Sequence, residues 1–445
     1  MSFIDDYKQK LTTPEKAVEL VRDGDWVDYG MAYQMPTILD SALAQRKGEL
    51  KDVKVRGYLA MDKIQVIEQD PDMESFTYYS WFCSGIERKY YNQGKVVFCP
   101  MTFRNLPSYY DRGYAKVDVA VISVTPMDKH GYFNISGING ATDAFLNAAD
   151  RIILEVNENL PYVFAGEGDS IHISKVDAVV EGPHGPVSQL PSGEPTEEDK
   201  KIAGFIMENM VDGATLQLGI GGLPYSVGKS IAESDLKNLG IHTEMLGDAY
   251  VDMIKAGKIT NSEKTVNRGK SVFGCALGTQ KLFDLIDHNP SMMTMPISYV
   301  NSPYVISQID NFIAINGAIA VDLYGQTCAE SVGTRHISGS GGQLDFLTGA
   351  YDSKGGKNFI AMTAAFTDKK GVKHSRIVPH FGGDIVTDPR SQGFYLATEY
   401  GIINLAGKTN WERVEDLISI ADPDFREDLI KSAEELGIWK RSNKR

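Results

Sequence analysis

The residues of this sequence best suited to chemistry are a glycine-rich turn and a glutamate that follows it. The turn is Leu218-Gly219-Ile220-Gly221-Gly222-Leu223-Pro224, and we expect it between a strand and a helix. Glycines let a backbone approach a ligand closely, and the first N–H groups of a helix can hold an anion. A predicted strand at 240–242 would place Glu244 beside this turn. A carboxylate there can attack an acyl carbon as a nucleophile, while N–H groups of the loop stabilise the oxyanion.

The same turn nearly matches two phosphate-binding motifs. A dinucleotide-binding motif requires a third glycine where this sequence has Pro224, although Glu244 follows at about the distance of a ribose-binding acid. A P-loop has four residues between its glycines, whereas five separate Gly222 from Gly228-Lys229-Ser230. A nucleotide-binding protein is therefore the alternative that involves no catalysis. A purely structural turn with a surface Glu244 and a structural His242 is the simplest interpretation of the spacing.

Two further loops have the composition of ligand-binding segments. Residues 337–346 contain Ser338-Gly339-Ser340-Gly341-Gly342, a loop whose backbone can pack against a ligand or another loop. Residues 123–132 follow a predicted buried strand, where ligands of α/β proteins bind. The sequence contains no G-x-S-x-G or H-E-x-x-H motif, and its four cysteines form no C-x-x-C pair. We therefore expect no metal site.

The elements that would position these residues occur twice. Matching the Leu-Lys pairs Leu50-Lys51 and Leu236-Lys237 puts Tyr58 opposite Glu244. We interpret the repeat as an internal duplication in which only the second copy carries the acid. Each half has a helix, an Asp-Gly pair, a strand, a loop from a glycine to a proline, and a second helix. In the first half these are, in this order, 17–21, Asp23-Gly24, 26–29, Gly30–Pro36 and 38–43. In the second half they are 202–210, Asp212-Gly213, 215–218, Gly219–Pro224 and 226–232.

Repeated strand–loop–helix units predict an α/β fold with parallel-rich sheets flanked by helices. Proline and glycine concentrate in 181–195, which predicts a linker between an N-terminal domain at 1–180 and a C-terminal domain at 196–445. Ligands of such sheets bind outside the carboxyl ends of the strands, which here means the loops that begin at Gly30 and Gly219. We expect further strands at 117–122, 151–156, 271–276, 312–315 and 359–364, and helices from Asn410 and Pro423.

The overall composition excludes several classes of protein. With 45 basic and 59 acidic residues the net charge is −14, which argues against binding of a nucleic-acid backbone. The acidic start has no apolar core and so does not have the pattern of a secretory signal. No apolar run approaches the ~18 residues of a membrane span. We expect a cytoplasmic protein without a membrane partner.

Taken together, the motifs resemble those of the family I coenzyme A transferases. The branch most similar is that of the butyryl-CoA:acetate and 4-hydroxybutyrate CoA-transferases, near the acetyl-CoA hydrolase/transferase group. The order and spacing of the motifs, over essentially the whole chain, make the resemblance specific. The segments that carry it are 216–224, 241–245 and 341–346, with further matches at 24–30, 84–89, 321–326 and 439–443.

The resemblance implies two similar domains with the active site in the cleft between them, usually in a homodimer or larger homo-oligomer. The substrates would be an acyl-CoA and short-chain carboxylates, and no cofactor is implied because coenzyme A and its thioesters are substrates. Glu244 would form a glutamyl–CoA thioester, with the N–H of Gln217 and the Gly341-Gly342 turn as oxyanion donors. The implied CoA contacts are Gly219, Ile220, Gly221, Gly222, Leu223, Ile319, Gly342, and Lys369 or Lys370.

The function implied is a ping-pong transfer of CoA from butyryl-CoA to acetate. Glu244 would attack the thioester, CoA would attack the resulting glutamyl anhydride, and the acceptor acid would reverse both steps. The enzyme alternatives are a 4-hydroxybutyrate CoA-transferase and an acyl-CoA hydrolase on the same scaffold.

Overall fold

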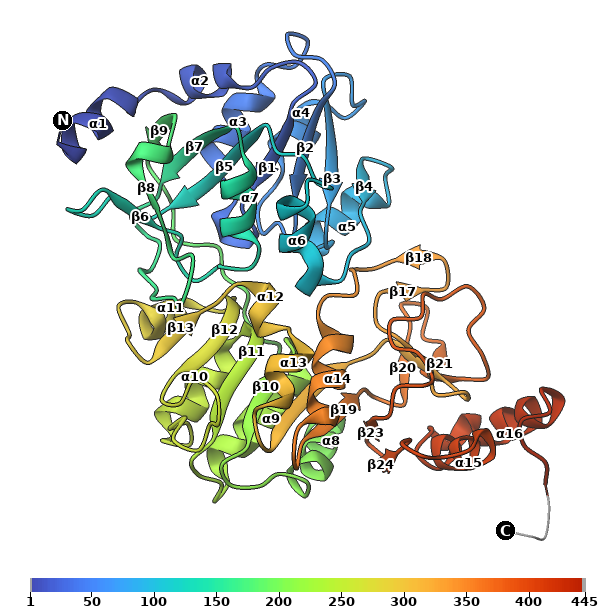
Figure 1. The fold of residues 1–445 in the computed structure, drawn as a ribbon. Helices are drawn as coiled ribbons and strands as arrows, with labels where there is room; N and C mark the ends of the chain where they lie inside the picture. The colour runs from blue at the N-terminus through green and yellow to red at the C-terminus, as the bar shows by residue number, and fades with distance from the viewer. Residues whose placement is uncertain (1, 442–445) are drawn as a thin grey trace. The chain divides into compact units, whose positions relative to one another are not determined.

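Two large β-sheets with connecting helices make up the structure, a computed structural model that describes residues 2–441 (Figure 1). Strands and helices alternate along most of the chain, and helical crossovers are what allow neighbouring strands to run parallel. The α/β class predicted from the sequence is confirmed.

The first sheet has seven strands, each parallel to its neighbours. The strand β5 is buried along its whole length, as is typical of a parallel sheet covered on both faces. Val27, Val55 and Val121 belong to one apolar cluster around this sheet. Across the sheet, the strands are β4 (Val96–Phe98), β3 (Phe76–Ser80), β2 (Val53–Gly57), β1 (Trp26–Tyr29), β5 (Val119–Val124), β7 (Arg151–Val156) and β9 (Ala178–Glu181).

The second sheet repeats this order and adds one strand. Its neighbours from β11 to β23 are parallel, and its last pair, β23 and β24, is antiparallel. Across the sheet, the strands are β13 (Met292–Thr294), β12 (Ser271–Ala276), β11 (Gly240–Leu246), β10 (Thr215–Leu218), β14 (Phe312–Gly317), β19 (Lys357–Ala361), β23 (Tyr395–Thr398) and β24 (Gly401–Asn404).

The two sheets also share one register, which confirms the predicted duplication. Counting on along β2 and β11 from the paired residues places Tyr58 opposite Glu244, as the matching of the Leu-Lys pairs predicts. The paired residues Val27–Val55, Val27–Val119 and Val119–Arg151 of the first sheet correspond, in this order, to Leu216–Ile241, Leu216–Ile313 and Ile313–Lys357 of the second sheet.

The chain divides into two compact units. Unit 1 contains the described residues up to Leu190 together with Val272–Val300, and unit 2 contains Pro191–Ser271 and the described residues from Asn301 onward. The first division falls inside the predicted linker at 181–195. The predicted C-terminal domain at 196–445 is interrupted, because Val272–Val300 groups with unit 1, where the N–H of Ala276 donates to the carbonyl of Gly137 at 2.8 Å.

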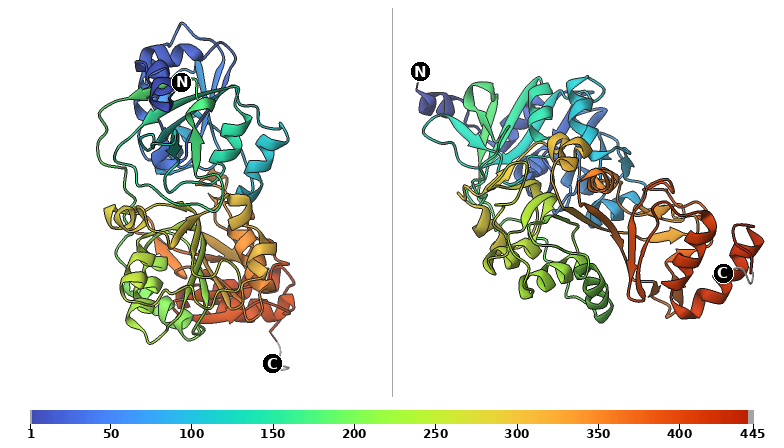
Figure 2. Two further views of the ribbon diagram at one scale, coloured as in Figure 1. Left: turned by 60° about the vertical axis from the view of Figure 1, so that its left-hand side comes forward. Right: turned by 60° about the horizontal axis from the view of Figure 1, so that its bottom comes forward.

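The predicted helices at 38–43, 202–210, 226–232 and from Asn410 are present, with differences at their ends. The predicted helix at 17–21 is instead the end of α2 followed by a 3-10 turn, Val18–Leu20. The predicted helix at Pro423 is a 3-10 turn, Pro423–Phe425, and α16 begins after it; the C-terminal helices are drawn in red in Figure 2. Unit 1 has α1 (Phe3–Lys10), α2 (Pro14–Ala17), α3 (Thr37–Ala44), α4 (Gln65–Gln69), α5 (Gly85–Tyr91), α6 (Leu106–Asp111), α7 (Thr142–Ala148), α11 (Gln280–Ile286) and α12 (Ile297–Val300). Unit 2 has α8 (Glu197–Met207), α9 (Gly222–Glu233), α10 (Asp248–Lys255), α13 (Pro303–Ser307), α14 (Gln343–Asp352), α15 (Asn410–Ser419) and α16 (Arg426–Glu435).

The part of the chain that the structure describes contains neither a membrane-spanning helix nor a cluster of metal-binding side chains. Among residues 2–441, no helix has both the length and the apolar character needed to cross a membrane. In the same part of the chain, no three His, Cys, Asp or Glu residues are grouped so that they could hold a metal ion.

Candidate active site

Glu244 lies near the carboxyl end of β11, inside the strand rather than after it. The first residues of β11 are buried in the core, and the exposure increases toward Glu244. His242 is completely buried, and its ring meets that of Phe312 edge to face at a centroid distance of 6.0 Å. His242 is therefore a core residue, and Glu244 is the carboxyl group that the partly exposed end of the strand presents.

The carboxylate of Glu244 accepts hydrogen bonds from two groups of unit 2. Asn301 donates from Nδ2 to Oε2, and the backbone N–H of Gly342 donates as well. Asn301 is completely buried, and its Oδ1 accepts no hydrogen bond from the residues that the structure describes. Because a buried oxygen without a donor is costly, a ligand that donates to Oδ1 of Asn301 would be stabilised there.

The surroundings shift the acidity of Glu244. Burial raises the pKa of this carboxyl to about 7, and the nearby charge of Asp345 acts in the same direction. The hydrogen bonds from Asn301 and Gly342 oppose these effects because they favour the charged form. Gly342 immediately precedes α14, so the positive end of that helix also favours the carboxylate. Glu244 can thus be ionised near neutral pH while being more basic, and so more nucleophilic, than an ordinary glutamate.

Position 342 has room for glycine alone. A Cβ atom there would lie 2.1 Å from Nδ2 of Asn301 and 2.2 Å from Oε2 of Glu244. The preceding Gly341 has a φ of +57°, a conformation that glycine adopts without strain. The glycine-rich loop predicted to pack against a ligand therefore brings its backbone to the Glu244 carboxylate.

The predicted glycine loop lines a pocket of about 330 Å³ in unit 2. Gly221 has a φ of +114°, and α9 begins directly after it. Among residues 2–441, no side chain caps the start of α9, so its first N–H groups can hold an anion. The opposite walls come from the ends of two neighbouring strands, including Gly317 of β14 and Ala361 of β19. Ile220 to Leu223 thus line a pocket where the sequence predicts a ligand, whereas Gly219 is outside the lining.

Arg376 brings a positive charge to this pocket. Its Nε donates to Oγ1 of Thr363 at 3.2 Å, and its Nη1 donates to the carbonyl of Ile319 at 3.0 Å. The guanidinium also lies 4.8 Å from the ring centroid of Phe366. Burial lowers the pKa of Arg376, yet an arginine stays charged at any physiological pH. Ile319, a predicted CoA contact, therefore orients a cation that can bind a phosphate or carboxylate.

Lys369 and Lys370 lie in an exposed turn that leads to Arg376. The turn joins β20 (Ala365–Thr367) and β21 (Lys373–Ser375), which pair as an antiparallel hairpin. The two lysines are outside the lining of the 330 Å³ pocket. A contact of either lysine with a bound ligand would therefore involve a part of the ligand that extends beyond this pocket.

Gln217 is buried in β10 and exchanges two hydrogen bonds with Asn316 of β14. The donor–acceptor distances between the two side-chain amides are 3.1 and 2.9 Å. Asn316 lines the pocket, so the side chain of Gln217 fixes the orientation of a pocket residue. The oxyanion role implied for the backbone N–H of Gln217 stays a prediction.

Two residues of this region, Asn301 and Arg376, are missed by the sequence reasoning. Asn301 is 57 residues from Glu244 in the chain and follows a short helix, so no local spacing connects them. The sequence did point to Arg376, because this arginine follows shortly after Lys369 and Lys370, either of which was predicted to contact CoA.

Comparisons with known proteins identify the family of this chain. Residues 1–191 match the acetyl-CoA hydrolase/transferase N-terminal domain, and residues 278–433 match the acetyl-CoA hydrolase/transferase C-terminal domain. The butyryl-CoA:acetate CoA-transferase of Anaerostipes caccae is 48% identical, over 100% of both chains. The probable butyrate:acetyl-CoA coenzyme A-transferase of Syntrophomonas wolfei is 46% identical, over 99% of this chain and 98% of that protein.

The fold has a solved counterpart as well. The crystal structure of RipA from Yersinia pestis superposes with a TM-score of 0.91 at 36% identity, covering 98% of this chain and 100% of RipA. Sequence and fold agree over both halves of the protein. The chain belongs to the acetyl-CoA hydrolase/transferase family, and its most similar relatives named above are CoA-transferases.

Proposed function

We propose that the protein is a CoA-transferase that exchanges CoA between butyryl-CoA and acetate, with Glu244 as the nucleophile. The observation that carries the proposal is the carboxylate of Glu244, held by Nδ2 of Asn301 and the N–H of Gly342 at the end of β11. The names of the two bacterial relatives support this choice of acyl group and acceptor.

The first half-reaction begins when a carboxylate oxygen of Glu244 attacks the thioester carbonyl of the acyl-CoA. The C–S bond breaks, which gives an acyl-glutamyl anhydride and the CoA thiolate. The thiolate then attacks the glutamyl carbonyl and releases the first carboxylate, leaving CoA as a thioester of Glu244. The acceptor carboxylate reverses both steps. As written, the reaction uses only Glu244 and the substrates, so it requires no metal or redox cofactor.

The donors around Glu244 suit this chemistry. When a thiolate or carboxylate adds to the glutamyl carbonyl, negative charge develops on its oxygen. Asn301 and the N–H of Gly342 already donate to Glu244, so they would stabilise that oxyanion without rearrangement. This assigns the predicted oxyanion role to Gly342 of the Gly341-Gly342 turn and adds Asn301 to it.

The 330 Å³ pocket supports a binding mode for CoA. The Gly219–Leu223 loop and the start of α9 would lie along the ligand, and Arg376 would bind a phosphate group. Lys369 and Lys370, which are exposed beyond the pocket, would bind a more distant phosphate. Phosphate groups of CoA would then hold the ligand through charge while the thiol reaches Glu244.

The test is to trap the glutamyl–CoA thioester. Incubation with butyryl-CoA in the absence of an acceptor should place CoA on Glu244, and borohydride should reduce the thioester to an alcohol. Irreversible inactivation and a lower mass of the peptide that carries Glu244 are the expected results. Addition of acetate before borohydride should protect the enzyme, because it discharges the thioester.

The control for the trap is Glu244→Gln, which keeps the shape but lacks the nucleophile. This variant should fold, lose transfer by several orders of magnitude and show no reduced peptide. Continuous release of CoA without acceptor, with no reduced peptide in the wild type, would favour an acyl-CoA hydrolase. Initial-rate plots that intersect rather than run parallel would contradict a ping-pong reaction.

The assembly and location of the protein are further proposals. We propose a homodimer or larger homo-oligomer in the cytoplasm, as the family resemblance implies. Light scattering coupled to gel filtration measures the assembly, and a monomer at all concentrations would contradict it. Fractionation of the producing cells with an antibody against the protein tests the location.

A further inference from the structure

Unit 1 contains a pocket of about 430 Å³ that the proposed reaction does not use. It lies where β5 and β7 end and where α3 begins, and its lining includes Ser123, Asn157 and Thr37. His184 and Lys63 also line it. Because the two sheets share one order and register, this location corresponds to that of the 330 Å³ pocket of unit 2.

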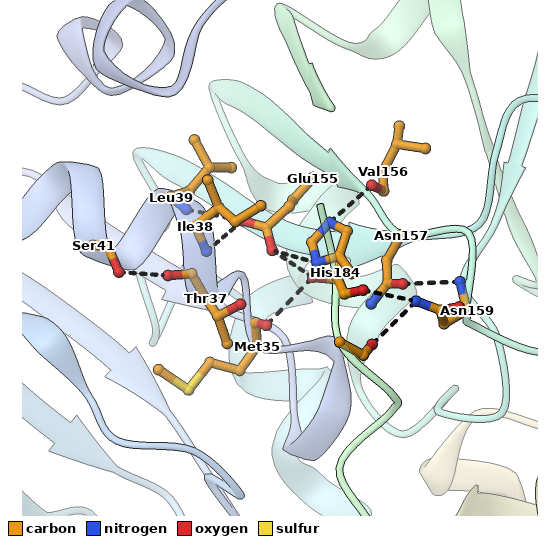
Figure 3. A network of polar contacts seen from close by, with 12 residues as sticks. Met35, Thr37, Ile38, Leu39, Ser41, Glu155, Val156, Asn157, Asn159 and His184 are labelled. Atoms are coloured by element: carbon orange, nitrogen blue, oxygen red, sulfur yellow. Dashed lines mark hydrogen bonds and ion pairs between the residues drawn. The ribbon is translucent and has the colours of Figure 1, made fainter. Parts of the chain in front are cut away.

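A buried carboxylate, that of Glu155, contacts two residues of the pocket lining, Ser123 and His184, and belongs to the network of polar contacts in Figure 3. Glu155 of β7 is completely buried, and its Oε2 accepts hydrogen bonds from the N–H groups of Ile38 at 3.0 Å and Leu39 at 2.8 Å. Both donors belong to the first turn of α3, where a helix has N–H groups without backbone partners. Glu155 therefore holds the position that an external anion would otherwise take at this helix.

The other oxygen of Glu155 is enclosed as well. Its Oε1 accepts from Oγ of Ser123 at 3.3 Å and lies 3.9 Å from Nδ1 of His184 (Figure 3). Nε2 of His184 donates to the carbonyl of Val156 at 2.9 Å, which fixes the ring between the end of β7 and the carboxylate. These contacts hold Glu155 in one orientation, so it does not leave the helix start to a ligand.

The register shows what replaces Glu155 in unit 2. Arg151 and Lys357 correspond, so counting along β7 and β19 places Glu155 opposite Ala361. By the same count Ser123 corresponds to Gly317, and both Gly317 and Ala361 line the open pocket. The carboxylate of unit 1, Glu155, and the serine that donates to it are thus replaced by two small residues in unit 2.

The helices α3 and α9, which follow β1 and β10, also differ at their first turn. In unit 1, α3 begins directly after Pro36, whereas α9 begins two residues before Pro224 and is therefore about one turn longer at this end. The N-cap residue of α9 is Gly221, which has no side chain to bond the first N–H groups, whereas the start of α3 donates to the carboxylate of Glu155. In unit 1, the N–H groups at the start of α3 thus donate to a carboxylate of the protein itself, whereas in unit 2 the N–H groups at the start of α9 are available to a ligand.

We propose that Glu155 is an internal carboxylate that closes the anion site of unit 1, so that this site of the duplicated fold is open to a ligand in unit 2 alone. The part of this statement that concerns unit 2 rests on the proposed function. Glu155 is thus one of the residues that distinguish the two copies of the duplicated fold, together with Tyr58 at the position that corresponds to Glu244.

The experiment removes the carboxylate and supplies it again from solution. Glu155→Ala introduces the residue that unit 2 has at this position, and the atoms removed correspond in size and charge to acetate. The variant should melt about 5 °C or more below the wild type, because the buried N–H groups of Ile38 and Leu39 lose their acceptor. Sodium acetate should raise its melting temperature in a saturable manner, measured against sodium chloride at equal ionic strength.

The controls are the wild type and Glu155→Gln, which fills the same space and keeps one acceptor oxygen. Acetate should stabilise both much less than Glu155→Ala, and the wild type measures any effect of acetate at unit 2. Equal effects of acetate on Glu155→Ala and on the wild type would overturn the proposal. This comparison involves no CoA, so it is independent of the proposed function.

A reciprocal pair of variants decides the matter if Glu155→Ala does not fold. Ala361→Glu places a carboxylate at the corresponding position of unit 2, and Ala361→Gln is its uncharged control. Calorimetric titration should show that Ala361→Glu binds CoA at least about tenfold more weakly than Ala361→Gln. Equal affinities of the two variants would overturn the proposal. A wild-type protein that does not bind CoA would instead contradict the proposed function.

Discussion

Gly342 lies so close to Glu244 that a Cβ atom at position 342 would be 2.2 Å from Oε2 of the glutamate. The backbone of the glycine-rich loop is therefore part of the surroundings of the carboxylate. Its N–H donates to Glu244, and its lack of a side chain leaves room for Asn301 to do the same.

Gly342→Ala should impair the reaction more than the fold. The added methyl group displaces Asn301 or Glu244, so we expect kcat/KM to fall by about 100-fold or more. The control is Gly204→Ala in α8, where a Cβ atom would meet nothing within 4 Å. It should leave kcat/KM unchanged and stabilise the protein slightly. Steady-state kinetics and thermal melting measure both, and a Gly342→Ala enzyme with wild-type kcat/KM would contradict the geometry.

The rate should depend on pH through Glu244. Only the carboxylate attacks the thioester, so kcat/KM for acyl-CoA should rise as the pH passes through about 7. Asn301→Ala removes a hydrogen bond that lowers the pKa of Glu244, so the midpoint should move to higher pH and the plateau should fall. Initial rates across a pH series measure the midpoint. A variant with the wild-type midpoint would show that Asn301 does not act through the acidity of Glu244.

Gly221→Val should weaken CoA binding more than it weakens folding. Gly221 has a φ of +114°, which a β-branched residue adopts only with strain, and a side chain there would enter the pocket. The matched control is Gly333→Val, since Gly333 also has a positive φ, +57°, and open space but lies outside the pocket lining. Calorimetric titration with CoA should separate the two variants. Equal CoA affinity of the two variants would show that the Gly219–Leu223 loop is structural and does not bind CoA.

Lys264 should make the stability of the protein depend on pH. Burial lowers its pKa to about 7, and its Nζ donates to the carbonyls of Ile241 and Lys270, both at 2.7 Å. Between pH 7 and the ordinary lysine pKa of 10.5 the unfolded state binds the extra proton, so raising the pH favours the folded state. The free energy of unfolding of the wild type, relative to Lys264→Met, should increase by up to about 1.4 kcal/mol per unit of pH.

Denaturant unfolding of both proteins at several pH values tests this prediction. Groups other than Lys264 titrate in both proteins, so their contributions cancel in the difference between the two curves. A difference that does not change with pH would mean that Lys264 stays protonated in the folded protein.

Glu244, the glycine loop near it in sequence and the distant Gly342 were predicted, whereas Asn301 was not. The strand–turn–helix pattern around Gly219–Leu223 is local, so it could be read directly and placed Glu244 beside a ligand loop. Asn301 reaches Glu244 only because the chain returns after 57 residues, and such a return depends on packing that no local pattern encodes.

The duplication was predictable because glycines, prolines and Leu-Lys pairs mark equivalent turns in both halves. The role of Glu155 was not predicted, since 151–156 was interpreted only as a buried strand. A signal was present, because an acidic residue inside Ile152-Ile153-Leu154-Glu155-Val156 must find partners when it is buried. The helix start that satisfies it lies more than 100 residues earlier in the chain.

The interrupted order of the two units has a consequence for biosynthesis. Unit 1 includes Val272–Val300, whose backbone bonds to Gly137 and Gly140 within that unit. A ribosome must therefore release some 300 residues before unit 1 can be complete, and by then much of unit 2 has already emerged. Cleavage of the gene near codon 190 would separate unit 1 from one of its own segments. An exchange of the two halves at that point would therefore leave unit 1 without the segment that completes it.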